Sequence, residues 1–518
     1  MRFKELSEND KVFIANIYQD KSILWNKRLN ILADKYDVDE RNMRKWIKKL
    51  GLSKQEVTNS EQYLEAKKKK HNKKQYYIIT WAQNDTEVHK ELLQNIIAYS
   101  EFLDAEVLVI AGIYNNPRSL ESSKNLKNKV SWDSSVLPYL DANRHNIHKY
   151  LMVLSDIRVM PTAYNPLSGF EGVSGLESSL IGHPKQVLTP IPILDGHPHK
   201  ILMTTGAVTK PNYTQTKAGA KGEFDHVLGF AIVEIRDSEN FHIRNVSASL
   251  DGEFNDLFNN VKDGEVTRNK SLEGVVLGDL HCGSEDEEVM IETFKFMDKL
   301  KPKKVVLHDV FDGYSISHHH DKMPFLRYQK ALSGRDVLID EINYMTKYLS
   351  NFEKYEDVII VRSNHDSHVD KYLNEKDWKK DIVNSKTYME FSLAIMNGEA
   401  NNGIIPYIIK KEYPEFTCLD EGESYMIKKI ESGMHGDRGS NGARGTSTGF
   451  RKLPVKNIVG HSHSPKIDGG SYTVGTSTLL RLEYNKGLSS WMNSHCTIDN
   501  LGKRQLLLFV NGKFTTLK

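Results

Sequence analysis

The first part of the chain carries apolar residues at helical spacing. Over residues 7–53 they recur every three or four positions in three short segments. Ser7 is a possible N-terminal cap of the first segment, and Gly51 is a typical stop after the third. The pattern predicts three short helices that pack into a small helical domain.

A different pattern begins at residue 76, where short apolar runs replace the helical spacing. The first two runs predict strands, and the segment between them has the spacing of an amphipathic helix. The predicted strands are residues 75–80, 105–114, 148–156, 199–206 and 226–235, and the predicted helix is residues 85–104. We therefore expect an α/β domain over residues 76–265, whose role the sequence leaves open. Its His183, His197 and His199 lie in proline-rich turns, which favours ordinary turns over metal ligands.

Five apolar runs after residue 272 share one format, in which a predicted strand leads into a turn with polar side chains. The first is VVLGDLHCG, residues 275–283. The polar residues of the five turns are Asp279 and His281; Asp309 and Asp312; Asn364, His365 and Asp366; His435; His461 and His463. Because the carboxyl ends of strands in α/β sheets meet at one edge, these side chains are expected to converge.

The residue types in these turns suit divalent metal ions. Carboxylates, imidazoles and one amide carbonyl are ligands for Mn²⁺, Fe²⁺ or Zn²⁺, and no thiolate is needed. A carboxylate can bridge two ions about 3.5–4 Å apart, a spacing that serves in-line attack at phosphorus. A lone D-x-H or H-x-H pattern is common in loops, but five such turns in succession favour a binuclear metal centre.

The succession D-x-H, H-D-x-x-D, S-N-H-D, H and G-H-x-H resembles the calcineurin-like binuclear metallophosphoesterases, over residues 272–518. The catalytic half also resembles large phage-encoded members that degrade host DNA, and SbcD-type repair nucleases. The resemblance implies a four-layer αββα sandwich in this half, preceded by the α/β domain and a helix-turn-helix. The fold class is therefore expected to be α/β.

The same resemblance implies a role for each polar residue. One metal ion would be held by Asp279, His281, Asp309 and His463, and a second by Asp309, Asn364, His435 and His461. Asp309 would bridge the ions, and His365 would contact the phosphate and the leaving oxygen. Mn²⁺ is the first expectation for both ions, with Mg²⁺, Fe²⁺ or Zn²⁺ as alternatives.

Other residues near these turns are further candidates. Asp312 and Asp366 are expected to support histidines, and His318 in the run His318–His320 to reach the phosphate or act as an acid. Where the family has glycine, this chain has His308 and Ser363, each before a ligand position, which bears on local backbone conformation. Cys282 is expected to be a small packing residue.

Charge is distributed unevenly along the chain. Residues 1–74 hold 19 Lys and Arg against 11 Asp and Glu, a net charge of +8, whereas the whole chain has +2. The segment 32–53 resembles the helix-turn-helix of DNA-binding domains. By this resemblance Met43, Trp46, Ile47 and Leu50 would pack inward, and Arg41, Asn42, Arg44, Lys45 and Lys48 would face DNA. A glycine-rich run adds Arg438, Arg444, Arg451 and Lys452 as candidate phosphodiester contacts.

These observations predict a metal-dependent DNA nuclease with four regions. They are a helical domain at 1–57, a Lys-rich linker at 58–75, the α/β domain at 76–265 and the catalytic domain at 266–518. A phosphomonoesterase acting on proteins or nucleotides, and a catalytically silent DNA-binding protein, remain alternatives. The partners expected are DNA and further copies of the chain, with residues 76–265 as a candidate module for oligomerisation or for a DNA channel.

The composition places the expected site of action in the cytoplasm, which is the host cytoplasm if the protein is phage-encoded. No apolar run approaches the roughly 20 residues that cross a bilayer. The N-terminus lacks the apolar core of a signal peptide. With three cysteines, no disulfide framework is implied.

Overall fold

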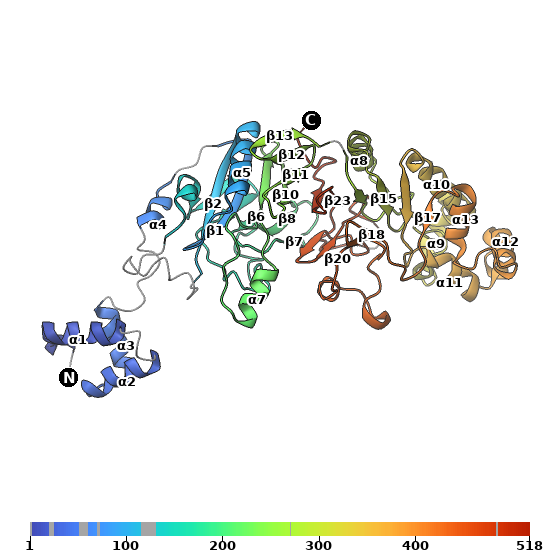
Figure 1. Cartoon of the computed structure of the whole chain (residues 1–518). Coiled ribbons are helices and arrows are strands. Elements are labelled where there is room, and N and C mark those ends of the chain that lie inside the picture. Colours follow the sequence, from blue (N-terminus) through green and yellow to red (C-terminus); the bar gives the residue numbers. More distant parts are fainter. Residues whose placement is uncertain are drawn as a thin grey trace.

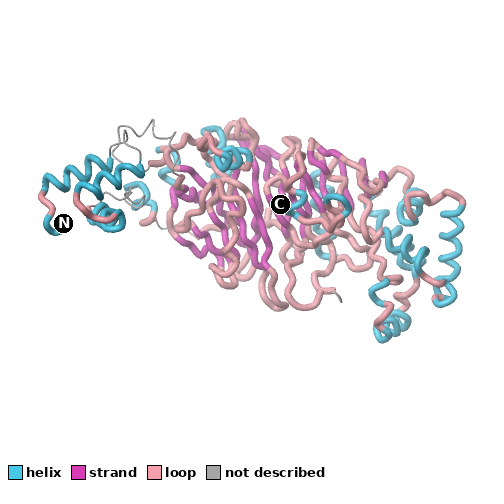
Figure 2. The backbone as a smooth tube through the Cα atoms, turned by 90° about the horizontal axis from the view of Figure 1, so that it is seen from below, coloured by secondary structure: helices cyan, strands magenta, loops and turns pink. Residues whose placement is uncertain are grey.

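The computed structural model describes residues 3–19, 25–50, 61–69, 73–114, 131–269, 271–482 and 485–517. It confirms the α/β class: strands form the centre of the molecule, and helices lie toward its ends (Figure 2). The N-terminal helices lie apart from this body (Figure 1). Among the described residues, no helix is long and apolar enough to cross a membrane.

Three helices form the N-terminal region, after a 3₁₀ turn at Phe3–Glu5. They are α1 (Glu8–Gln19), α2 (Trp25–Lys35) and α3 (Glu40–Lys49). The inward residues expected in α3 are buried at Met43, Trp46 and Ile47, and Leu50 packs partly buried against them. Arg41, Asn42, Arg44 and Lys45 are exposed, and the side chain of Lys48 lies outside the described ones. Contact of this face with DNA stays a prediction.

Part of the predicted linker is packed against the body. Helix α4 (Glu61–Ala66) buries Tyr63 and Ala66 in the core of the middle region, where the Tyr63 ring stacks on Trp132 at 6.1 Å between centroids. Lys69 Nζ donates to the Leu137 carbonyl at 2.9 Å. Residues 51–60 and 70–72 of this segment lie outside the described residues.

The middle region contains a five-stranded sheet in the order β10-β9-β1-β2-β3. Its strands are β1 (Tyr76–Gln83), β2 (Ala105–Gly112), β3 (Leu140–Asp141), β9 (Gly229–Ile235) and β10 (Phe241–Ser247). Helix α5 (Lys90–Leu103) connects β1 to β2 and covers one face. A small sheet of β11 (Phe254–Asp256), β12 (Asn259–Lys262) and β13 (Glu265–Arg268) follows.

The C-terminal region contains a six-stranded sheet in the order β17-β16-β15-β14-β23-β24. Its strands are β14 (Gly274–Val276), β15 (Lys304–Leu307), β16 (Asp357–Ile360), β17 (Thr417–Cys418), β23 (Ser494–Ile498) and β24 (Arg504–Leu508). Helices pack on its outer face: α8 (Glu287–Leu300), α10 (Leu338–Leu349), α11 (Ser367–Glu375), α12 (Ser385–Met396) and α13 (Ile404–Glu412). The other described helices are α7 (Lys217–Phe224), α9 (Pro324–Ser333) and α14 (Ser447–Phe450), with 3₁₀ turns at Ser134–Tyr139, His318–His320, Ser350–Phe352, Trp378–Lys380, Ile382–Asn384 and Ser440–Gly442.

One ten-stranded sheet joins the two regions, in the order β18-β19-β20-β22-β21-β7-β8-β6-β5-β4. Its C-terminal strands are β18 (Met426–Ile427), β19 (Ile430–Glu431), β20 (Lys456–Val459), β21 (Lys466–Asp468) and β22 (Ser471–Thr473). Its middle-region strands are β4 (Arg144–His148), β5 (Leu151–Leu154), β6 (Ser178–Ile181), β7 (Val187–Ile191) and β8 (Lys200–Thr204). The predicted boundary at residue 265 therefore lies between regions that share a sheet.

One apolar core lies between this sheet and the five- and six-stranded sheets. Val276 and Val306 of the six-stranded sheet share a cluster with Ile458 and Ile467, and Ile79 and Ile110 of the five-stranded sheet join it. The C-terminal region thus has a helical layer and two facing sheets. The complete four-layer arrangement remains a prediction.

Candidate metal centre

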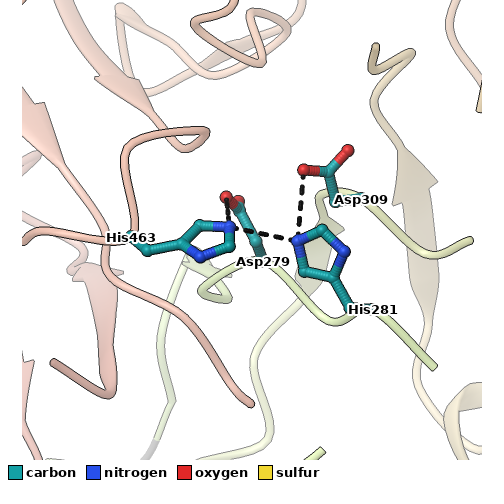
Figure 3. A group of neighbouring side chains, drawn as sticks. All are labelled: Asp279, His281, Asp309 and His463. Atoms are coloured by element: carbon teal, nitrogen blue, oxygen red, sulfur yellow. Dashed lines mark hydrogen bonds and ion pairs between the residues drawn. The ribbon is translucent and has the colours of Figure 1, made fainter. Parts of the chain in front are cut away.

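The predicted turns converge at one edge of the facing sheets. The turn after β14 carries Asp279 and His281, the turn after β15 carries Asp309, and the turn after β20 carries His463. All four side chains are buried, and one ligand atom from each lies within 4.8 Å of the others (Figure 3). Parallel pairing of β14 with β15 places the first two turns side by side.

The distances inside this group suit a shared cation. His463 Nε2 lies 3.1 Å from Asp279 Oδ2, and His281 Nε2 lies 3.5 Å from Asp309 Oδ2. The Nε2 atoms of the two histidines face each other at 3.0 Å. Since metal–ligand bonds to nitrogen and oxygen are about 2.0–2.2 Å, donors at these separations can surround one ion.

A second group extends from the first through Asp309. His435 Nε2 lies 3.2 Å from Asp309 Oδ2 and 3.1 Å from Asn364 Oδ1. The His461 ring lies 5.2 Å from the His435 ring, between centroids. Asp309 therefore stands between two sets of donors, as a bridging carboxylate would.

Backbone conformation is unusual at four of these residues. His281, Asp309, His461 and His463 have φ angles of 44°, 45°, 70° and 55°. Residues other than glycine rarely adopt this left-handed region, at a cost on the order of 1–3 kcal/mol each. Backbone strain of this kind collects at functional sites, because the surrounding structure holds it for a purpose other than stability.

The electrostatics of the group also fit a cation. The buried Asp279 Oδ1 and Asp309 Oδ1 have no hydrogen-bond partner among the described residues. Burial disfavours a charged His281 or His435, but the nearby carboxylates, Asp309 foremost, together outweigh it and raise the pKa of each to about 9. The same histidines lower the pKa of Asp309, against its burial. Carboxylates and imidazoles buried this close together form a donor set that suits divalent ions.

Neighbouring residues orient the ligands. His281 Nδ1 donates to Asp312 Oδ1 at 3.0 Å, which leaves Nε2 facing the group. The Asp279 carbonyl accepts from Ser477 N at 2.8 Å and from Thr476 Oγ1 at 3.0 Å. Gly278 N donates to His495 Nδ1 at 2.9 Å. These contacts hold the first turn from three sides.

Two glycines before the ligands are required by space. A Cβ on Gly278 would lie 2.6 Å from the Ser494 carbonyl oxygen. A Cβ on Gly460 would lie 2.3 Å from Asp279 Oδ1. The glycines of GDLH and GHSH therefore allow the close approach of the two turns.

His365 is partly exposed and lies beside the group. Its Nδ1 donates to the Asp312 carbonyl at 2.6 Å, and its ring lies 4.5 Å from the His281 ring, edge to face. The side chain is 24% exposed, so it can be reached from solvent. Burial lowers its pKa.

The structure separates His318 from the ligands. Its ring lies 5.8 Å from His368, whose ring lies 4.7 Å from His365. His318 is thus two rings away from the metal-binding group. A cavity of about 110 Å³ beside it is lined by His318, His368 and Lys371, among others.

Two expectations are wrong: that Asp366 supports a histidine, and that Arg451 is a candidate phosphodiester contact. Asp366 Oδ2 accepts from Ser363 N at 3.1 Å, and its buried Oδ1 has no hydrogen-bond partner among the described residues, so neither oxygen supports a histidine. Arg451 is not a free cation on the glycine-rich loop: its side chain is 7% exposed and pairs with Asp468 at 2.9 Å and Asp225 at 3.2 Å. Because these two ion pairs neutralise the charge of Arg451, its side chain is not free to bind a DNA phosphate.

The other loop cations remain at the surface. Arg444 is exposed, and Arg438 is exposed but paired with Glu421 and Asp437. Cys282 is buried as expected, and burial raises the pKa of its thiol.

Sequence reasoning missed three residues. Trp491 packs its ring 4.1 Å from the His463 ring, and His368 packs on His365. His308, read only as a backbone departure, is fully buried, and neither ring nitrogen has a hydrogen-bond partner among the described residues. Burial lowers its pKa to about 4. An isolated tryptophan or histidine has no spacing signal that could have singled it out.

Fold and site together define an α/β protein with a buried carboxylate–histidine group suited to metal ions. Comparison with known proteins narrows this class. The chain is 32% identical over 460 residues to "Protein A1" of Escherichia phage T5, a match covering 85% of this chain and 82% of that protein. The chain belongs to the family of that phage protein. No protein-family model and no solved structure matches it.

Proposed function

We propose that the protein is a metal-dependent nuclease that hydrolyses phosphodiester bonds of DNA. The observation that carries this proposal is the buried group at the strand ends, in which Asp309 lies between the donors of His281 and those of His435. Two divalent ions, with Mn²⁺ as the first candidate, would be held by Asp279, His281, Asp309, Asn364, His435, His461 and His463. When bound, they would supply positive charge to the phosphate and a nucleophile at neutral pH.

The protein's own residues would prepare this chemistry. Asp312 keeps the proton of His281 on Nδ1, so that Nε2 is available as a ligand. His365 donates from Nδ1 to a carbonyl, which leaves its Nε2 to contact a phosphate oxygen and to exchange a proton with the leaving oxygen. Asp312 therefore orients both histidines, one through its carboxylate and the other through its carbonyl.

DNA is the substrate that the surroundings favour. Exposed Arg41, Arg44 and Lys45 form one cationic face on α3, and exposed Arg444 lies on the loop that follows His435. Such cations pair with phosphates along a polymer and have little use for a small monoester. A phage relative supports a phage-related role, and we include degradation of host DNA in the proposal.

The test is digestion of end-labelled linear DNA and closed-circular DNA with Mn²⁺ or with a chelator. A phosphomonoester assay runs beside it. We expect Mn²⁺-dependent cleavage of DNA, and loss of cleavage in His435→Ala with the fold unchanged by circular dichroism. Intact DNA alongside turnover of the monoester would instead favour the phosphatase alternative, and no hydrolysis of either would favour the silent DNA-binding protein.

A second variant separates binding from chemistry. Deletion of residues 1–60 removes the α3 cations but keeps α4, which packs in the core of the middle region, so we expect weaker DNA binding with a flatter dependence on salt. Hydrolysis of a small diester should be retained. Unchanged DNA affinity in this truncation would remove the helical region from the proposed interface.

A further inference from the structure

The strands of the middle region repeat those of the C-terminal region in the same chain order. We name residues 76–247 the middle lobe and residues 274–508 the C-terminal lobe. In the smaller sheets, the order β3-β2-β1-β9-β10 matches β16-β15-β14-β23-β24. In the shared sheet, β4-β5-β6-β8-β7 matches β18-β19-β20-β22-β21. Ten strands of one lobe thus correspond one to one with ten strands of the other, and among the strands that the structure describes in the two lobes only β17 lacks a counterpart.

The directions of the strands correspond as well. The pairs β1–β2 and β14–β15 are parallel, and each is connected by a helix of 14 residues, α5 or α8. The pairs β1–β9 and β14–β23 are antiparallel. In the shared sheet β5–β6 and β19–β20 are parallel, whereas β7–β8 and β21–β22 are antiparallel.

The register places a twofold axis between the lobes. Leu188 pairs with Met203 in one lobe, and Ile467 pairs with Tyr472 in the other. Leu188 and Ile467, which correspond, pair with each other across the antiparallel junction of β7 and β21. Two equivalent residues face each other in this way only at a local twofold axis.

This correspondence locates the counterpart of the metal centre. Val208 N donates to the Trp81 carbonyl at 2.9 Å, as Ser477 N donates to the Asp279 carbonyl at 2.8 Å. Trp81 therefore occupies the place of Asp279, and Gln83 that of His281. In the parallel register Ile110 lies opposite Trp81, at the place of Asp309.

The fourth turn keeps part of its sequence. β20 is followed by Gly460-His461-Ser462-His463, and β6 is followed by Gly182-His183-Pro184-Lys185. His183 Nε2 donates to the Met160 carbonyl at 3.0 Å, and its Nδ1 accepts from Lys185 N at 3.1 Å. Both ring nitrogens are thus used. Tryptophan, isoleucine and lysine replace the ligands Asp279, Asp309 and His463, so this turn cluster has lost the donor set of a metal site.

The lobes differ in one connection near the axis. The turn between β21 and β22 is Gly469-Gly470, whereas the equivalent connection between β7 and β8 spans residues 192–199. This longer loop reaches the C-terminal lobe. Ile193 N donates to the Ser489 carbonyl, and Ser489 N donates to the Ile193 carbonyl, both at 3.0 Å. Asp195 Oδ1 lies 3.6 Å from Arg481 Nε, which adds an ion pair between the loop and the C-terminal lobe.

The loop held by Ile193 contacts a metal-ligand candidate. Trp491, two residues after Ser489, packs its ring on His463, and Met492 N donates to the His463 carbonyl at 3.1 Å. His281 is oriented by a hydrogen bond from Nδ1, but the Nδ1 of buried His463 has no partner among the described residues. Packing against Trp491 takes the place of that hydrogen bond.

We propose that the middle lobe is a second, metal-free copy of the C-terminal fold, and that its 192–199 loop positions His463 through Ser489 and Trp491. The inference rests on the proposed metal centre. The middle lobe then has a defined task, to hold one wall of the site, and the chain has one metal centre for two copies of the fold.

Metal stoichiometry tests the first half of this proposal. Mn²⁺ is titrated into the full chain, and free Mn²⁺ is followed by electron paramagnetic resonance. We expect two ions per chain and none retained by Asp309→Ala. More than two ions, with the excess persisting in Asp309→Ala, would overturn the metal-free middle lobe. Failure of the unchanged chain to bind Mn²⁺ would overturn the metal centre itself.

Mn²⁺ affinity tests the second half. Trp491→Ala is expected to weaken binding of one of the two ions by about tenfold or more, the usual effect of removing a group that orients a ligand. Trp491→Phe keeps a ring and should remain within a few-fold of the unchanged chain. Replacing residues 192–199 by Gly-Gly copies the turn of the other lobe, so the sheet can close, and should weaken Mn²⁺ binding like Trp491→Ala.

The matched control is Leu194→Ala, on the same loop, where the side chain is 55% exposed. It should leave Mn²⁺ affinity unchanged. Two ions bound with normal affinity in both Trp491→Ala and the Gly-Gly variant would overturn the positioning role while leaving the proposed nuclease intact.

Discussion

The two lobes share one strand arrangement but carry different side chains at equivalent strand ends. In the C-terminal lobe the strand ends carry buried carboxylates and imidazoles, and His281, Asp309, His461 and His463 all have positive φ angles. No positive φ angle occurs at their counterparts in the middle lobe, which are Gln83, Ile110, His183 and Lys185. The left-handed conformations are therefore a property of the ligand set and not of the strand arrangement, which illustrates that function resides in the site.

The largest expected difference between the lobes is in catalysis. Asp309→Ala removes the candidate bridging carboxylate and should lower DNA hydrolysis at least about a thousandfold, or about 4 kcal/mol of transition-state stabilisation. Ile110→Val at the equivalent place should leave hydrolysis unchanged and lower the free energy of unfolding by about 1 kcal/mol. Rates on labelled DNA with Mn²⁺ measure the first effect, and urea unfolding the second. Equal losses of activity would contradict the assignment of one catalytic lobe.

Buried charge in the middle lobe should serve stability instead. Arg244 is 2% exposed and binds Asp256 through Nε at 2.5 Å, and it also pairs with Glu234. Arg244→Ala leaves two buried carboxylates without a cation and should lower the free energy of unfolding by about 3–5 kcal/mol. Lys262→Ala removes an exposed lysine that pairs with Glu253, and it should lower the free energy of unfolding much less. Urea unfolding of both variants, with chelator present, checks the difference.

A smaller effect is expected on the free energy of unfolding at acidic pH. His495 donates from Nε2 to Thr293 and accepts from Gly278, and burial lowers its pKa to about 3. Because the folded pKa lies below the ordinary 6.5, the neutral ring contributes fully above pH 6.5, and its contribution falls as the pH decreases toward 3. Relative to His495→Gln, the unchanged chain should lose about 2 kcal/mol between pH 6.5 and 5, at about 1.4 kcal/mol per pH unit.

Unfolding at several pH values, without metal ions, measures this difference. In the middle lobe Ala231 corresponds to His495, since the pairs Ile78–Ile232 and Val276–Cys496 are equivalent. Alanine does not titrate, so this acid dependence belongs to the C-terminal lobe. A parallel acid dependence in the unchanged chain and in His495→Gln would place the acid-sensitive group elsewhere.

The smallest expected effect is on DNA binding. Arg444→Ala removes one exposed cation, so DNA affinity should fall a few-fold, and the slope of log affinity against log salt should decrease by about 1. Lys262→Ala in the middle region serves as the matched charge control. Fluorescence anisotropy with labelled DNA at several salt concentrations measures both. Equal losses in the two variants would indicate a nonspecific charge effect instead of an interface beside the site.

Much of the metal-binding group was predictable, because each ligand follows an apolar strand and brings its own residue type. Asp279, His281 and Asp309 could be identified in this way. The lobe correspondence could not, since it lies in strand order and hydrogen bonding: no residue property relates Trp81 to Asp279. The exposed Arg444 and the buried Arg451 also look alike in sequence, and only their surroundings distinguish them.

The sequence by itself determined that apolar strands lead into polar turns and which side chains can bind a metal ion, because both depend on local pattern and residue chemistry. Tertiary structure alone decided that the turns meet, that Leu188 faces Ile467 across a twofold axis, and that Ile193 holds the loop of Trp491. These pairings join residues hundreds of positions apart. They form because the sheets bury their apolar faces against each other. The sequence of any one segment does not specify which distant segment it will pack against.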